Sequence, residues 1–187
     1  MPMNNDIAPR SDEIVIYTNG QIAKVGQRIW PVCAIVYETR QPSRTETVAF
    51  SMEKKGPTGS KYSPKAQRAA LRAAVGALEL KIWSSEGFKQ VIIATDNREV
   101  FFGMTENIEE WQARGMPRKL KNQDLWSHAL DLVNEQAYHG CEVKFWLTSV
   151  KMNKQAFDAA RAVDPGERAP KAYQPRGDVG FTFKEAL

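Results

Sequence analysis

The sequence predicts an α/β domain with a mixed five-stranded sheet and helices on both faces. Three short apolar, β-branched runs follow one another closely near the start of the chain. Two more such runs come later, and amphipathic segments separate them. Strands joined by short connections pair antiparallel, whereas strands reached through helices usually run parallel to a neighbour. The predicted order is therefore βββ–α–β–α–α–β–α.

The first three predicted strands occupy residues 14–18, 30–37 and 45–52. The first, IVIYT, is followed by Asn19-Gly20, a pair that is typical of a turn. Residues 54–60 contain two glycines and a proline and are predicted to form a loop.

A long helix is predicted over residues 63–86. Ser63 is a suitable N-cap, Pro64 suits the first helical position, and Gly87 lies just past the end. The helix carries an apolar stripe at helical spacing, made of Ala70, Leu71, Ala74, Leu78 and Ile82.

The remaining elements alternate between strands and helices. A buried strand is predicted at residues 90–95, followed directly by Asp96, and a short helix at 98–104. A loop rich in arginine and lysine leads to a helix at 123–139, which Gly140 ends. The last strand is predicted at 142–147 and the last helix at 153–163.

Length and composition fit one globular domain. The 187 residues are 42% hydrophobic and 26% charged, enough apolar material for a core. We expect a loose leader at 1–12, the domain at 13–163 and a tail at 164–187. The net charge of +4 favours an anionic partner only mildly.

The two cysteines, Cys33 and Cys141, are far apart within apolar runs, which excludes a zinc site of usual spacing and predicts buried, reduced thiols. The chain shows neither a run long enough to span a membrane nor a signal-peptide core. We therefore expect an intracellular protein, cytoplasmic or nuclear, without a membrane partner.

Five motifs, in order, resemble those of ribonuclease H. They are Tyr17-Thr18-Asn19-Gly20; Gln67-Arg68-Ala69-Ala70-Leu71; Ala94-Thr95-Asp96-Asn97; Trp111 to Gly115 followed by Lys121-Asn122-Gln123-Asp124-Leu125-Trp126; and Phe145-Trp146 followed by Asn153-Lys154-Gln155-Ala156. The resemblance covers about residues 14–163. It implies a domain that binds an RNA–DNA hybrid and uses Mg²⁺ ions to hydrolyse the RNA strand.

The resemblance also implies four metal-binding carboxylates, and this chain departs from that set. The corresponding positions hold Asn19, Ala70, Asp96 and Phe157, and the position of an assisting loop histidine holds Leu147. Paired dications need several converging carboxylates, and Asp96 alone is too weak a cage. We therefore expect no two-metal catalysis; a divalent ion beside Asp96 is the one metal site left open.

Two alternatives bear on this conclusion. A shift of one residue would place Asp158 instead of Phe157 at the site, but a helical side chain rotates by about 100° per residue and would point elsewhere. Asn19 and Ala70 could also be engineered, because Asp-to-Asn and Glu-to-Ala are the changes made to trap substrate on an inactive enzyme. Phe157 and Leu147 are not such changes, so natural degeneration is the simpler interpretation.

Nucleic-acid binding needs phosphate contacts more than metal. The candidate residues are Lys65, Gln67, Arg68, Arg114, Arg118, Lys119, Lys121 and Asn122. The alternatives for these are a solvated basic loop and, for Arg68, simple pairing with a carboxylate. His128 and His139 lack clustered partners and are expected at the surface or at a helix end.

Three functions follow. The first is an inactive RNase H-like module that binds RNA–DNA hybrid, RNA or DNA without cleaving it. The second is a scaffold whose former substrate face docks a protein partner. The third is a hybrid ribonuclease that carries inactivating substitutions or an unforeseen ligand set.

Overall fold

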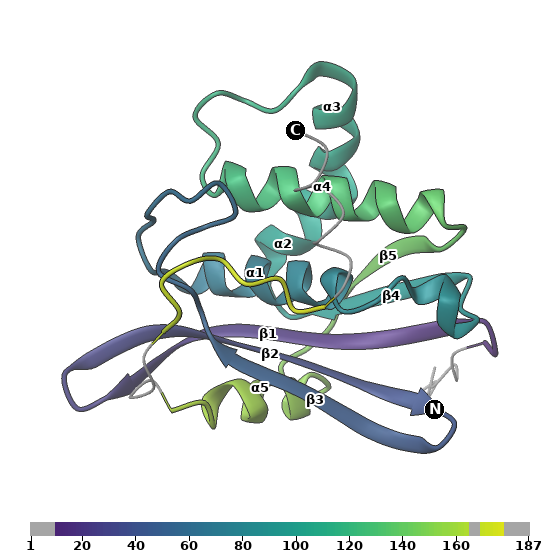
Figure 1. The fold of residues 1–187 in the computed structure, drawn as a ribbon, viewed down its shortest axis with the longest axis horizontal. Helices are drawn as coiled ribbons and strands as arrows, with labels where there is room; N and C mark the ends of the chain where they lie inside the picture. Colours follow the sequence, from purple (N-terminus) through teal and green to yellow (C-terminus); the bar gives the residue numbers. More distant parts are fainter. Residues whose placement is uncertain (1–9, 165–168, 178–187) are drawn as a thin grey trace, which may run out of the picture.

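The computed structural model describes residues 10–164 and 169–177 of the chain (Figure 1). The expected leader falls mostly on residues 1–9, outside the described part. Much of the expected tail falls on residues 165–168 and 178–187, which lie outside it as well.

The fold is built on one five-stranded sheet with the strand order β3-β2-β1-β4-β5. Its strands are β1 (Glu13–Val25), β2 (Arg28–Arg40), β3 (Ser43–Ser51), β4 (Gln90–Thr95) and β5 (Glu142–Leu147). The first three pair antiparallel, while β4 is parallel to both β1 and β5. The predicted α/β class and mixed five-stranded sheet are confirmed.

Strand β1 differs from its prediction. It does not turn at Asn19-Gly20 but continues to Val25, because residues 16–25 remain paired with β2. The β1–β2 hairpin turns at Gly26, which has a φ of 60°. The Asn19-Gly20 pair therefore lies inside a strand, and Gly20 is needed there for another reason, described below.

The long helix is shorter than predicted. Helix α1 covers Ala66–Glu79, and its N-cap is Lys65, not Ser63, with no side-chain cap hydrogen bond. Ile82 is extended, with φ −77° and ψ 100°, and a short 3-10 helix, Trp83–Glu86, follows. The apolar pattern ran on past the end of the helix because Ile82 also packs against the core.

The region after β4 is more helical than predicted. Helix α2 (Arg98–Phe102) continues through a π-helical turn (Gly103–Asn107) into α3 (Ile108–Arg114). Glycine is needed at position 103, because a Cβ there would lie only 2.2 Å from the Trp126 ring. The two last helices are α4 (Gln123–Tyr138) and α5 (Lys154–Arg161).

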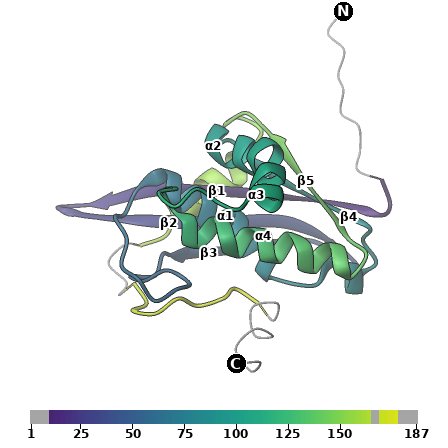
Figure 2. The same cartoon turned by 90° about the horizontal axis from the view of Figure 1, so that it is seen from above.

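Helices cover both faces of the sheet. Helices α1 and α4 lie side by side on one face, and α5 lies on the other (Figures 1 and 2). The main core packs between α1, α4 and the sheet, with Ile16, Ile35 and Ile93 fully buried. A smaller cluster of Val32, Ala34 and Ala160 joins α5 to the sheet.

The cysteines and the membrane prediction can be checked directly. Cys33 and Cys141 are free and buried, as expected. Among the described residues, no helix is both long enough and apolar enough to cross a bilayer.

Candidate functional site

The candidate site lies where β1 and β4 run side by side. Their parallel register pairs Thr18 with Thr95, so the next residues, Asn19 and Asp96, are neighbours. Asn19 is buried, and its Nδ2 donates to both oxygens of Asp96, at 3.4 Å to Oδ1 and 3.2 Å to Oδ2. The amide nitrogen of Asn19 therefore faces the carboxylate.

Helix α1 reaches this point because Gly20 has no side chain. A Cβ on Gly20 would lie 2.0 Å from the carbonyl carbon of Ala69 and 2.2 Å from the nitrogen of Ala70. The Cys33 thiol on β2 also donates to the Ala69 carbonyl oxygen, at 3.2 Å. These contacts press the backbone at Ala69 and Ala70 against β1, beside Asn19.

Helix α5 is fixed to the same strand from the opposite face. The buried Asn153, which precedes α5, donates from Nδ2 to the carbonyl oxygen of Thr18 at 2.9 Å. Gln21 donates from Nε2 to Asn19 Oδ1 at 3.0 Å and to the Phe157 carbonyl oxygen at 2.9 Å. The backbone of Phe157 is thereby joined to Asn19 through one side chain.

The neighbouring carboxylate and the last strand complete the surroundings. Asp158 is exposed and forms an ion pair with Lys154, one helical turn earlier, so its carboxylate is in solvent. Leu147 ends β5 opposite Thr95 and is half-buried. The structure therefore groups Asn19, Asp96 and Ala70 with the backbone of Phe157.

This donor set does not fit a pair of Mg²⁺ ions. Magnesium requires several oxygen ligands in near-octahedral geometry. Asp96 supplies the one carboxylate of the group, and the Asn19 amide turned toward it presents hydrogens instead of oxygen. Within the described residues, no group of three or more His, Cys, Asp or Glu side chains could hold a metal ion.

A second feature, a polar pocket, lies at the start of α1. It is lined by five of the residues that the sequence suggested for nucleic-acid binding, with Tyr62 and Asp124 among its other walls: Lys65, Gln67, Arg68, Lys121 and Asn122. Asn122 has a left-handed backbone, with a φ of 57°, just before α4 begins. We refer to this feature as the α1 pocket.

Arg68 forms the inner wall of the α1 pocket. Its guanidinium is buried, donates to both oxygens of Asp124 at 2.8 and 2.6 Å, and donates to Asn122 Oδ1 at 3.2 Å. It also stacks on the Tyr62 ring at 3.9 Å. The bidentate pair lowers the pKa of Asp124, although burial opposes it. Arg68 thus organises the pocket and has little surface of its own.

The other basic candidates are exposed. Arg118, Lys119 and Lys121 form no ion pair with any described residue. Arg114 pairs with Glu110 at 3.3 Å, and the first turn of α3 also contains Glu109, so this helix is not a continuous basic surface. Gln67 donates to Glu99 on α2 at 2.7 Å.

Sequence reasoning did not identify several residues that shape these features. Gln21, Asn153 and Tyr62 position backbone or side chains at these features. Gln21 follows the first motif and Asn153 begins the second part of the fifth, but neither was given a role, and Tyr62 lies outside the motifs. His128 was expected at the surface or a helix end. Its side chain is instead only 20% exposed and contacts the buried Glu79 at 2.9 Å.

The exposed His139 lies at the end of α4 and pairs with Glu135, in line with the expectation for it.

Comparison with known proteins adds the family. Residues 11–163 match the family model described as RNase H. No curated protein matches the chain significantly.

Solved structures that share the fold include the following three. The structure of LC9-RNase H1, described as a type 1 RNase H with the type 2 active-site motif, has a TM-score of 0.57 and 20% identity, covering 81% of this chain and 72% of that one. The protease–reverse transcriptase of prototype foamy virus also has a TM-score of 0.57, with 16% identity over 81% of this chain and 21% of that one. RNase H1 of Halobacterium salinarum has a TM-score of 0.50 and 15% identity, covering 79% and 94%.

Proposed function

The chain belongs to the RNase H family, and we propose that it binds nucleic acid, above all RNA–DNA hybrid, without cleaving it. The observation that carries the proposal is the Asn19–Asp96 contact: the one carboxylate at the strand ends accepts hydrogen bonds from an amide. This arrangement satisfies Asp96 without a cation. It supports loss of metal-dependent hydrolysis, because activating water and stabilising the leaving oxygen need paired dications.

The neighbouring positions support the same proposal. Ala70 supplies no ligand, and Asp158, the nearest alternative acid in sequence on α5, is exposed and paired with Lys154. A shifted register would therefore require Asp158 to leave its partner and rotate around the helix. We propose that the family's metal-binding set is degenerate in this chain.

Binding rests on different residues. Lys65, Lys121 and Asn122 line the α1 pocket, and Arg118 and Lys119 are exposed in the adjacent loop. Their cations and amide can contact phosphate oxygens along a duplex, an interaction that gives affinity without sequence specificity. We propose Arg68 as the residue that holds Asn122 in place, not as a direct phosphate ligand.

The first experiment titrates a labelled RNA–DNA hybrid with the full chain at low and moderate salt, with Mg²⁺ and with EDTA. We expect binding that weakens with salt, does not need Mg²⁺, and leaves the RNA intact. Digestion of the RNA by the unaltered chain in Mg²⁺ would overturn the proposed inactivity. Absence of binding at every salt concentration would overturn nucleic-acid binding and favour the protein-docking scaffold.

A charge variant tests the binding face. Lys121→Ala should weaken hybrid binding and reduce the slope of log affinity against log salt by about 1, the amount expected for one phosphate contact. Lys89→Ala removes the same charge from an exposed residue just before β4, at the opposite end of this strand from Asp96, and should leave the slope unchanged. Equal effects of the two variants would mean that net charge, and not this face, controls binding.

Restoring the carboxylates tests whether the fold still supports cleavage once the acidic side chains are present. The triple variant Asn19→Asp, Ala70→Glu and Phe157→Asp supplies the acids that the family resemblance implies. Cleavage that appears only in this variant would show that the scaffold is competent and that these positions caused the loss. A cooperative thermal unfolding transition of the triple variant is the control that shows that the variant is folded.

A further inference from the structure

Residues 169–177, which we call the C-terminal strap, lie along α1 in the structure. Figure 1 shows this yellow segment crossing in front of α1. The Pro170 carbonyl oxygen accepts from the backbone nitrogen of Lys54 at 2.8 Å, just after β3. At the other end, a Cβ on Gly177 would lie 2.2 Å from the Leu80 carbonyl oxygen. The strap thus joins the loop after β3 to the end of α1.

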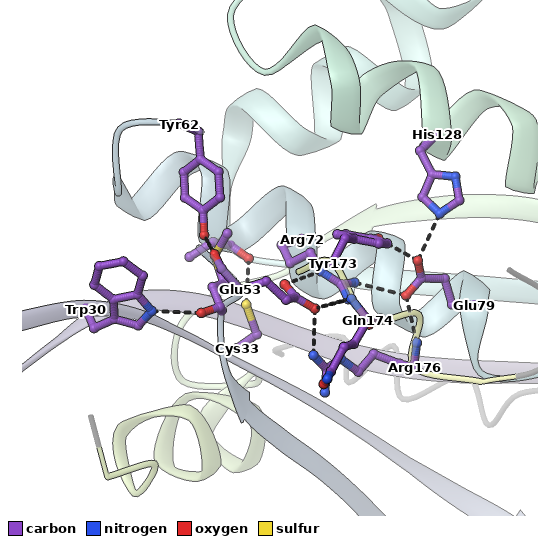
Figure 3. Close-up of polar contacts among 12 residues, drawn as sticks. Trp30, Cys33, Glu53, Tyr62, Arg72, Glu79, His128, Tyr173, Gln174 and Arg176 are labelled. Atoms are coloured by element: carbon purple, nitrogen blue, oxygen red, sulfur yellow. Dashed lines mark hydrogen bonds and ion pairs between the residues drawn. The ribbon is translucent and has the colours of Figure 1, made fainter. Parts of the chain in front are cut away.

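A balanced cluster of buried charges holds the strap in place (Figure 3). Arg72 on α1 pairs with Glu53 at 2.9 Å and with Glu79 at 3.0 Å, and all three side chains are at most 1% exposed. Arg176 of the strap pairs with Glu53 at 2.6 Å. Two guanidinium groups therefore face two carboxylates. Without Arg176, the two buried carboxylates would share one arginine.

Further contacts from the strap complete the cluster. The backbone carbonyl oxygen of Gln174 accepts a hydrogen bond from Arg72 Nη2 at 2.9 Å, and the backbone N–H of Gln174 donates to Glu53 Oε1 at 3.3 Å. The backbone nitrogen of Arg176 and the hydroxyl of Tyr173 donate to Glu79 at 3.0 and 2.5 Å. A buried charge needs such hydrogen bonds as well as a counter-ion. The strap supplies both.

Glu53 links this cluster to the α1 pocket. Its carbonyl oxygen accepts a hydrogen bond from the Tyr62 hydroxyl, and the Tyr62 ring stacks on Arg68. Arg68 in turn holds Asp124 and Asn122. Each contact is direct, so one continuous path runs from the strap to the pocket.

The backbone of the loop follows the same path. A Cβ on Gly56 would lie 2.0 Å from Asp124 Oδ2 and 2.6 Å from Arg68 Nη2, so the loop backbone lies against this ion pair. Two hydrogen bonds of 2.9 Å within the loop, from Gly56 to Ser60 and from Gly59 to Gly56, hold its shape. A shift at Glu53 would therefore reach the pocket through the loop as well.

We propose that the C-terminal strap is a positioning element: it fixes residues 53–62 through Glu53 and thereby sets Arg68 and Asn122 in the α1 pocket. The ligand of that pocket, nucleic acid, rests on the proposed function above. The positioning itself does not, and it can be measured without any ligand.

The ligand-free test follows amide hydrogen exchange in full-length variants. Arg176→Ala removes one charge of the cluster, and Gly177→Ala displaces the strap by steric overlap without changing charge. Both should speed exchange at Gly56 and Gly59 by at least about tenfold, the change expected for losing one charge-assisted hydrogen bond. Amides of the central strands β1 and β4 should keep their protection.

The controls separate positioning from loss of charge. Lys171→Ala removes a positive charge from an exposed strap residue that has no ion pair with any described residue, and it should leave loop exchange unchanged. Arg176→Lys keeps the charge and should recover much of the protection. Unchanged exchange at Gly56 and Gly59 in both Arg176→Ala and Gly177→Ala would overturn the proposal, as would equal effects of Lys171→Ala.

Hybrid binding gives the second readout. Arg176→Ala should weaken hybrid affinity several-fold while the salt slope stays that of the parent chain, because no phosphate contact is removed. Faster loop exchange without any change in affinity would overturn the coupling to the pocket. If the parent chain binds no hybrid at all, the proposed function fails, and exchange at Gly56 and Gly59 alone still decides whether the strap positions the loop.

Discussion

Replacing Arg72 by methionine should destabilise the domain by about 3 kcal/mol at neutral pH. The substitution keeps much of the side-chain volume but leaves Glu53 and Glu79 buried without their shared partner. Removing one member of a buried ion pair costs about 3–5 kcal/mol, because the remaining charge is uncompensated. Arg176 still pairs with Glu53 and His128 still contacts Glu79, so we expect the lower end of that range.

The cost should depend on pH in a defined direction. Burial by itself raises the pKa of Glu53 and of Glu79, but Arg72 and the other hydrogen-bond donors and cations around them together outweigh it, so both pKa values lie below their ordinary value. A carboxyl group with a lowered pKa contributes stability above its unfolded pKa of about 4.3, and this contribution is lost as the pH falls. In the Arg72→Met variant the strongest neighbouring positive charge is gone, so burial raises the pKa values of Glu53 and Glu79. Protonation of the two carboxylates at acidic pH then removes their uncompensated charge. The difference in stability between the two proteins should therefore shrink as the pH falls from the raised pKa values of the variant to the lowered pKa values of the parent chain.

Urea denaturation at several pH values between neutral and acidic measures this difference. Lys81→Met is the control, because the Lys81–Glu86 pair is 35% and 46% exposed and such surface pairs contribute about 0–1 kcal/mol. A loss below about 1 kcal/mol for Arg72→Met, or a loss that does not change with pH, would refute the assignment of a buried charge cluster that depends on Arg72.

Three further predictions concern single sites. Gly20→Ala should lower stability by about 1–3 kcal/mol or more, seen as a lower urea midpoint, because its Cβ would overlap the Ala69 backbone; an unchanged midpoint would contradict the close approach of α1 to β1. Cys33 should resist thiol reagents in the native protein at mildly alkaline pH and react with them in urea, because burial raises the pKa of its thiol and the thiolate is the nucleophile. Rapid labelling of the native protein would show that the thiol is accessible. Asp158→Ala should cost less than about 1 kcal/mol and leave hybrid affinity unchanged, because its pair with Lys154 is exposed; a large loss in either would place its carboxylate in the site.

The sequence was sufficient for the sheet and most helices because its strands are apolar, β-branched runs separated by clear breaks. It was misleading where one residue serves a tertiary contact. Asn19-Gly20 has the composition of a turn, yet Gly20 allows α1 to approach β1. The predicted helix ended at residue 104, yet the helical segment continues beyond it, and Gly103 within it leaves room for the Trp126 ring. Such contacts cannot be read from local pattern, because the partner is distant in sequence.

The juxtaposition of Asn19 and Asp96 could be predicted, since each directly follows an apolar run and parallel pairing of the two runs places the residues after them side by side. The charge cluster could not. Arg72 and Glu79 are seven residues apart on α1 and share a face with apolar residues, which was a usable signal that a charged pair is buried. Glu53 and Arg176 carried no such signal, because they lie outside regular elements and meet α1 only in the folded chain.

Asp96 and the cluster around Arg72 are balanced in different ways, and the difference bears on the proposed loss of catalysis. Around Arg72, opposite charges neutralise one another inside the protein, so the cluster is stable without any ion. A set of four converging carboxylates would instead repel one another and raise their own pKa values until a cation bound. Asp96, with an amide where such a set would place an acid, has no such repulsion to relieve. The proposed loss of the acids therefore removes a repulsion that only a cation could relieve, whereas the cluster around Arg72, which we propose positions the α1 pocket, is already neutralised within the protein.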